Sequence, residues 1–345
     1  MDRPAGWSVA NRAAMRSGLL RLVASNETEN DGQRRPGGGH APVKAGGVAL
    51  HRRASLDEAV VEVLSSSLDH FVANWPALRE SSDPEAVHQM RVALRRLRAA
   101  LGLLKRAVPC LEFETAAARA KTIAATLGEA RDWDVFRESL EAGPRGRLND
   151  EPSFYALLDV VELRRAQAHE KARAVVAEKA TKQFVDELRR ALRRRAWRGN
   201  ARDDAPRIGD PDSARDFAAK ALDRLHRRAV EKCEGLAALA PQQRHQARIA
   251  LKKARYAAEF FATLFDARPR ARTYLRAIGK IQENLGADND TATATRLLRE
   301  IEADGGKTTL AAGFVRGWRA REQEQGAAGA KKSEKILMRL EPFWR

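Results

Sequence analysis

The sequence contains the same arrangement of one histidine and several cations twice. The first copy, His88–Arg98, reads HQMRVALRRLR, and the second, His245–Arg255, reads HQARIALKKAR. In both, basic residues follow the histidine after three, seven, eight and ten positions, and the copies lie 157 residues apart without a gap. Repetition at a fixed offset indicates duplicated architecture. Guanidinium and ammonium groups at this density favour the binding of phosphate oxygens.

Helical geometry places the cations of each copy on one stripe. At 100° per residue, an apolar stripe lies beside the cations and is expected to face the core. The first cationic stripe holds His88, Arg91, Arg95, Arg98 and Lys105, and the second holds His245, Arg248, Lys252 and Arg255. Arg96 and Lys253 fall off these stripes. Glu259 joins the second stripe and is expected to neutralise its far end in part.

Like charges three or four positions apart on a helix repel one another by a few tenths of a kcal/mol per pair. A bound anion removes this cost, and an anion with repeating phosphates would engage successive cations while releasing counterions. The alternative interpretation is a solvated helix face. Each histidine either contacts the ligand or supports the start of its helix, and the sequence favours neither role.

A second element is repeated at nearly the same offset. Leu127–Asp132 reads LGEARD, and Leu285–Asp290 reads LGADND. Glycine permits a bend or a close approach between helices. The aspartates, Asp132 and Asp290, either accept hydrogen bonds from the cationic stripes or, as the favoured alternative, cap the following helix. Arg131 adds a candidate phosphate contact in the first copy only.

The bulk composition fits a helical protein with a polyanionic partner. The 345 residues suffice for two units, and 43% of them are hydrophobic but only 6% aromatic. The net charge of +17 favours nucleic acid, an anionic membrane surface or inorganic phosphate chains. The two cysteines, Cys110 and Cys233, show no metal or redox spacing, and no apolar run is long enough to span a membrane. We therefore expect a soluble, cytoplasmic protein with no membrane partner.

The periodicity predicts an all-α fold of two helical bundles in tandem. Residues 1–54 are expected to be flexible, residues 55–205 to form the first unit and residues 206–345 the second. Helices are expected over residues 55–75, 84–108, 111–140, 153–197, 213–239, 241–266, 270–303 and 308–323, with a short final helix from 333. The third and seventh of these are expected to break at Leu127-Gly128 and Leu285-Gly286. Asp83-Pro84 and Pro241 provide start signals for the helices that carry the two copies.

From Ser55 to Arg345 the chain resembles the CHAD family, the conserved histidine α-helical domain. The resemblance rests on Val87–Arg98, Leu127–Phe136, His245–Tyr256 and the ending Pro342–Arg345. It implies two four-helix bundles related by pseudo-two-fold symmetry, with basic helix faces lining a central groove or pore. It further implies non-catalytic binding of inorganic polyphosphate and association with polyphosphate granules.

Many relatives carry a triphosphate-tunnel (CYTH) domain before this domain, marked by an E-x-E-x-K signature that this sequence lacks. Residues 1–54 are too short for that barrel, and Pro42–Leu50 is similar to the connector that follows it. We therefore expect no triphosphatase activity.

Two other functions compete with polyphosphate binding. Nucleic acid would suit the charge, but the sequence has no recognisable reading motif and few aromatics on which bases stack. An enzyme that transfers or hydrolyses phosphate would use the two histidines, yet there is no Gly-rich phosphate loop, catalytic triad or metal cluster. The sequence therefore predicts no catalytic residue, no metal and no cofactor.

Overall fold

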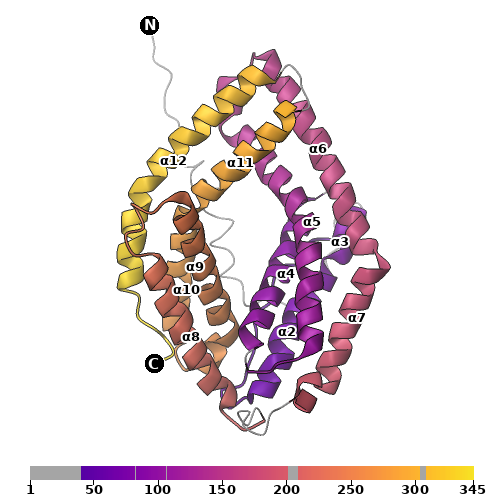
Figure 1. Cartoon of the computed structure of the whole chain (residues 1–345), viewed down its shortest axis with the longest axis vertical. Coiled ribbons are helices and arrows are strands. Elements are labelled where there is room, and N and C mark those ends of the chain that lie inside the picture. Colours follow the sequence, from indigo (N-terminus) through magenta and orange to yellow (C-terminus); the bar gives the residue numbers. More distant parts are fainter. Residues whose placement is uncertain (1–39, 82, 106, 201–208, 304–307) are drawn as a thin grey trace. The chain divides into compact units, whose positions relative to one another are not determined.

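The computed structural model describes residues 40–81, 83–105, 107–200, 209–303 and 308–345, apart from the side chains of 199–200, 287–289 and 323–328. Within these ranges the chain forms helices and no strand, which confirms the predicted all-α class (Figure 1). No helix among them is long and apolar enough to cross a membrane.

The helices up to residue 200 are α2 (Leu56–Ala73), α3 (Trp75–Glu80), α4 (Pro84–Leu104), α5 (Leu111–Ala142), α6 (Pro152–Ala177) and α7 (Lys179–Arg194), with short 3₁₀ turns at Pro144–Arg147 and Ala196–Asn200. Of these, α2, α4 and α6 begin at residues whose side chains cap them. Ser55 and Glu58 form a capping box at the start of α2. The carboxylate of Asp83 accepts a hydrogen bond from the backbone of Glu85 at 2.9 Å, so α4 begins as predicted.

The helices after residue 208 follow a similar order. They are α8 (Ser213–Lys232), α9 (Pro241–Phe261), α10 (Arg268–Asn284), α11 (Gly286–Ala303) and α12 (Thr309–Met338), with a 3₁₀ turn at Ala262–Leu264. Pro241 begins α9, as its position predicts. The expected break at Leu285-Gly286 is present, between α10 and α11.

Three helices are divided differently from the prediction, and the helix predicted over residues 213–239 ends earlier, at Lys232. Helix α5 continues through Gly128, because Leu127, Ala130 and Trp133 are buried around it and their packing outweighs the propensity cost of one glycine, about 1 kcal/mol. The long helix predicted over residues 153–197 divides at Glu178, whose extended backbone separates α6 from α7. Helix α12 is a single helix where the sequence predicted two.

The part of the N-terminal segment that the structure describes, residues 40–54, contains no helix and packs on the helices. The backbone N–H of Val43 donates to the Asn74 side chain at 2.9 Å, and the Asn74 amide donates back to the Val43 carbonyl at 2.9 Å. Farther along, the backbone N–H of Leu50 donates to Thr263 Oγ1 at 2.9 Å. The flexibility predicted for residues 1–39 lies outside the described residues.

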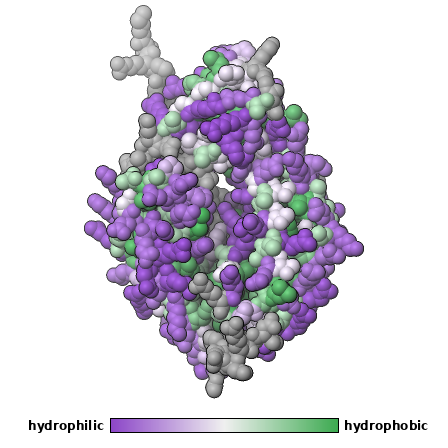
Figure 2. Space-filling view, in the orientation of Figure 1, coloured by the Kyte–Doolittle hydropathy of each residue, from purple (hydrophilic) through white to green (hydrophobic). Residues whose placement is uncertain are grey.

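The packing brings the two repeated helices together. Helix α4 packs on α2 and α5, α9 packs on α8 and α10, and α4 and α9 contact each other. Helix α5 likewise contacts α11. The apolar stripe predicted for α4 is buried: it consists of Met90, Leu94, Leu97, Leu101 and Leu104. On the face shown in Figure 2, hydrophilic side chains dominate the surface and hydrophobic ones form only small patches.

In each half of the chain, a Trp-Arg pair that follows the later helices donates hydrogen bonds to an aspartate of the first helix. Asp57 at the start of α2 accepts hydrogen bonds from Trp197 Nε1 at 2.8 Å and from Arg198 Nη2 at 2.7 Å. In α8, Asp223 accepts hydrogen bonds from the Trp344 indole at 2.9 Å and the Arg345 guanidinium at 2.8 Å. We call these two arrangements the Trp-Arg clasps.

Candidate anion-binding site

The contact between α4 and α9 is held by a buried ion pair that the sequence analysis missed. Arg96 Nη1 lies 2.8 Å from Glu259 Oε2, and only 7% of the Arg96 side chain is exposed. The Arg96 guanidinium also lies 5.4 Å from the ring centroid of Phe260. The sequence contained one sign of this pair: Arg96 falls off the cationic stripe. A cation on a buried face of a helix needs an acidic partner.

Four cations from the two copies form one group, which we call the cation cluster: Arg91, Arg95, Arg248 and Lys252. Burial, followed by the charges of Arg248, Arg95 and Arg91, lowers the pKa of Lys252 to about 8. The cations of α4 are thus close enough to act electrostatically on a lysine of α9. Among the described residues, no carboxylate forms an ion pair with Arg95 or Lys252, and Arg95 Nε is buried without a hydrogen-bond partner.

The first arginine of each copy lies against the repeated Leu-Gly element. Arg91 Nη1 donates to the carbonyl of Ala124 at 3.3 Å and lies over Gly128, where an added Cβ would be 2.6 Å away. In the second copy, Arg248 Nη1 donates to the carbonyl of Leu285. A Cβ on Gly286 would lie 3.9 Å from that nitrogen. Glycine therefore lets a guanidinium rest directly on the helix backbone in the first copy.

Two aspartates lie beside the cation cluster, and the favoured prediction that they cap helices is wrong. Asp132 is within the continuous α5, and Asp290 is within α11. Asp132 Oδ2 pairs with Arg296 Nη2 of α11 at 2.9 Å. Burial raises the pKa of Asp132; the charges of Arg91 and Arg296 oppose this rise, and Asp290 adds to it. Asp132 is therefore close to Arg91 of the first copy, and Asp290 is close to Lys252 of the second.

The two histidines occupy different environments. His88 is partly buried, and its pKa is lowered to about 4 by burial and then by the charge of Arg131; Arg95 and Arg91 add to this, whereas Glu85 opposes it. Arg131 therefore lies near the cluster, although its guanidinium also pairs with Glu138 at 3.2 Å. His245, the equivalent of His88, is exposed. The structure thus partly buries the first histidine among the charges of the cluster and leaves the second exposed.

The remaining predicted residues lie at the margin of the site. Arg255 Nε pairs with Glu259 at 2.8 Å, so the second stripe is neutralised at its far end, and Arg255 Nη1 donates to Gln282 at 3.3 Å. Arg98 is exposed on α4, and Lys105 is exposed just beyond the last residue of that helix. Neither is brought into the cluster by an interaction with its members.

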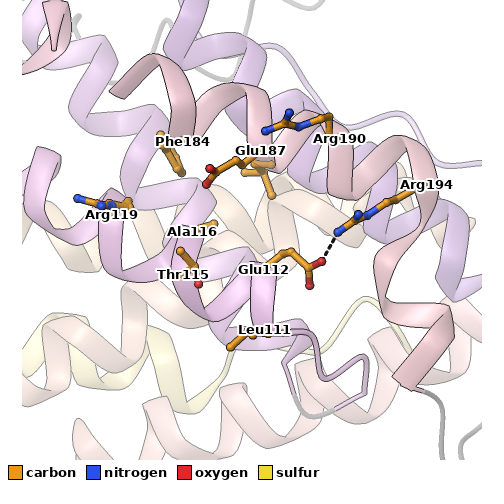
Figure 3. Close-up of a pocket in the computed structure, with 10 residues that line it drawn as sticks. Leu111, Glu112, Thr115, Ala116, Arg119, Phe184, Glu187, Arg190 and Arg194 are labelled. Atoms are coloured by element: carbon orange, nitrogen blue, oxygen red, sulfur yellow. Dashed lines mark hydrogen bonds and ion pairs between the residues drawn. The ribbon is translucent and has the colours of Figure 1, made fainter. Parts of the chain in front are cut away.

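A surface pocket elsewhere does not include any of the predicted residues. It lies between α5 and α7, has a volume of about 430 Å³ and is lined by Leu111, Thr115, Phe184 and charged residues (Figure 3). Glu112 and Arg194 form an ion pair across it. In the described ranges, no group of three or more histidine, cysteine or acidic residues is placed to hold a metal ion.

Comparison with known proteins identifies relatives for most of the chain. The family model of the CHAD domain matches residues 62–299. The crystal structure of the CHAD domain from the plant Ricinus communis is similar, with 30% identity and a TM-score of 0.77 over 88% of this chain and 98% of that chain. PptA from Streptomyces chartreusis shares the fold at 19% identity and a TM-score of 0.58, covering 82% of this chain and 100% of that one. No curated protein matches the sequence.

Proposed function

Since the chain belongs to the CHAD domain family, we propose that it binds inorganic polyphosphate, without catalysis, at the cation cluster between α4 and α9. In this proposal the two halves are four-helix bundles related by a pseudo-two-fold axis, and their basic faces form one groove. The protein would then associate with cytoplasmic polyphosphate granules.

The observation that carries the proposal is the concentration of positive charge around Lys252 and Arg95, neither of which forms an ion pair with a carboxylate of the described residues. A pKa of about 8 for Lys252, against an ordinary value of 10.5, corresponds to about 3 kcal/mol by which the surroundings disfavour its ammonium form. Arg95 adds a buried nitrogen without a hydrogen-bond partner. Phosphate oxygens satisfy both needs at once, because they bring negative charge and several hydrogen-bond acceptors.

The arrangement favours a linear ligand with phosphates in succession. Arg91 and Arg95 lie one turn apart on α4, and Arg248 and Lys252 lie one turn apart on α9. Each pair offers two neighbouring cations, and the electrostatic effect of Arg91 and Arg95 on Lys252 supports a site that includes both pairs. A chain of phosphates supplies charge at every unit and needs no aromatic platform, whereas single-stranded nucleic acid depends on stacking.

The test is a titration of the full chain with polyphosphate at several salt concentrations. We expect sub-micromolar affinity at low salt, and a loss of about three units in the log–log salt slope when Arg91, Arg95, Arg248 and Lys252 are all replaced by Glu. Four exposed cations of α7 provide the matched control, because their reversal changes the net charge equally: they are Lys179, Lys182, Arg190 and Arg193.

Equal loss of affinity in both variants would show that net charge alone attracts polyphosphate, and it would contradict a specific site at the cation cluster. Retained binding by the folded cluster variant would reject the site. Circular dichroism shows whether that variant folds, and a second variant with Gln at the same four positions removes the charges without reversing them.

Two further measurements separate polyphosphate binding from the competing functions. Competition against DNA and RNA at equal phosphate concentration and fixed salt should leave polyphosphate as the preferred ligand. Incubation of polyphosphate with the protein and Mg²⁺ or Mn²⁺ should release no orthophosphate. Preference for nucleic acid, or release of orthophosphate, would replace the proposed function by the corresponding alternative.

A further inference from the structure

The two copies of the repeated helix differ chemically at one position inside the cation cluster. Arg95 of α4 and Lys252 of α9 occupy the same place in the motif, seven residues after the histidine. A guanidinium stays protonated throughout the accessible pH range, whereas an ammonium loses its proton readily when it is partly buried. The second copy therefore contains a titratable cation where the first has a permanent one.

The groups around Lys252 are predominantly positive. Arg248 lies one turn away on the same helix, and Arg95 and Arg91 lie on α4, which contacts α9, and act on Lys252 electrostatically. Asp290 of α11 is the opposing negative charge, and it is itself close enough to Asp132 to raise the pKa of that carboxyl group. Lys252 is partly buried and makes no ion pair with any residue that the structure describes. The protein thus leaves its ammonium form poorly compensated.

We propose that Lys252 couples polyanion binding to proton uptake, so that the site binds its ligand more tightly as the pH falls. When phosphate oxygens reach the cluster, Lys252 Nζ takes a proton from solvent, and the ammonium group then donates to a phosphate oxygen. No other bond forms or breaks. This inference rests on the proposed function and adds a regulation of the same site.

The size of the effect follows from the two protonation states. Lys252 has a pKa of about 8 in the free protein, and a polyanion returns it toward the ordinary value of 10.5. Because the pKa is higher in the complex, the advantage is complete at pH values below the free pKa and is lost as the pH rises above it. Affinity is expected to fall about tenfold between pH 7 and pH 9, with uptake of about half a proton per site at pH 8.

Calorimetry on the full chain tests the coupling directly. Long-chain polyphosphate is titrated at pH 8 in two buffers with different ionisation enthalpies, which gives the number of protons taken up. The dissociation constant is then measured from pH 7 to pH 9. We expect Lys252→Arg to bind with little pH dependence, because the charge is kept and the titration is removed. Lys253→Arg is the matched control, because Lys253 is exposed on the same helix, and it should behave as wild type.

A second variant keeps the test decisive if arginine does not fit. Lys252→Gln should bind with little pH dependence and more weakly than wild type even at pH 9, because wild type still takes up a proton on binding there. Wild-type pH dependence in both Lys252 variants, or binding without proton uptake by wild type, would overturn the coupling and leave polyphosphate binding intact. Absence of binding at every pH would instead reject the proposed function.

Discussion

Replacement of Gly128 by alanine should separate the binding of polyphosphate from the stability of the fold. A Cβ at this position would lie 2.6 Å from Arg91 Nη1 and 3.7 Å from Cζ of the same side chain. The guanidinium must move by about 1 Å to restore ordinary van der Waals separation. Because it is the far end of a flexible side chain, it can move without disturbing the backbone.

The expected change in stability is small. Alanine in place of glycine within α5 contributes about 0.5–1 kcal/mol through helix propensity. Displacement of Arg91 removes its 3.3 Å hydrogen bond to the Ala124 carbonyl. This loss destabilises the fold by about 1 kcal/mol, which offsets the gain in helix propensity. The two effects nearly cancel, so the urea midpoint should stay close to that of wild type.

Affinity for polyphosphate, in contrast, should fall. Loss of one well-placed charged hydrogen bond is worth about 1.5 kcal/mol, which is about tenfold in the dissociation constant. Gly286→Ala is the matched control, because its Cβ would lie 3.9 Å from Arg248 Nη1, an ordinary contact. Gly102→Ala controls for propensity alone, since a Cβ at this exposed position of α4 meets no atom within 4 Å.

The reasoning is refuted if Gly128→Ala binds polyphosphate as tightly as Gly286→Ala does. It is also refuted if the affinity of Gly128→Ala falls only in proportion to a lowered urea midpoint, since the substitution would then act through unfolding.

Three other substitutions test the surroundings of the cluster. Glu259→Gln should lower the free energy of unfolding by about 3 kcal/mol in urea denaturation, because it leaves Arg96 and Arg255 without their shared, largely buried partner. His88→Gln should reduce the loss of stability between pH 6.5 and pH 4, which can reach about 3 kcal/mol in wild type. The folded-state pKa of His88 is lowered to about 4, so the unfolded chain binds the proton first as the pH falls. Asp132→Asn should tighten polyphosphate binding about three- to tenfold in a titration, because a negative charge beside Arg91 is removed.

Each of these substitutions has a control of the same chemical kind. Glu300→Gln removes an acid that pairs with Arg296 on the surface, and its effect on stability should stay below about 0.5 kcal/mol. His245→Gln changes an exposed histidine, and the loss of stability between pH 6.5 and pH 4 should stay as in wild type. Glu129→Gln alters an exposed pair with Lys171 on α5 and should not tighten binding. An effect of equal size in a control would contradict the corresponding explanation.

Local features of the sequence were sufficient to predict the helices that carry the cations. The cap at Asp83, the prolines at positions 84 and 241 and the apolar stripe of α4 are short-range signals, and the structure contains each of them. Gly128 was misinterpreted as a break because its cost is local, whereas the packing that outweighs it comes from other helices.

Long-range pairing could not be read from the same patterns. Arg96 and Glu259 are separated by 163 residues, so periodicity alone could not identify them as partners. His88 and His245 occupy identical positions in the motif, yet one is partly buried near Arg131 and the other is exposed. Burial depends on which elements pack around a side chain, and the repeat specifies only the helix that carries it.

The Trp-Arg clasps bear on the order in which the chain folds during synthesis. The donors to Asp57 lie 140 and 141 residues farther along the chain, in the short turn after α7. The hydrogen bonds of this clasp can therefore form only after Arg198 has left the ribosome. Contacts between such distant residues form slowly, and the clasp on Asp223 repeats the same delay over 121 and 122 residues.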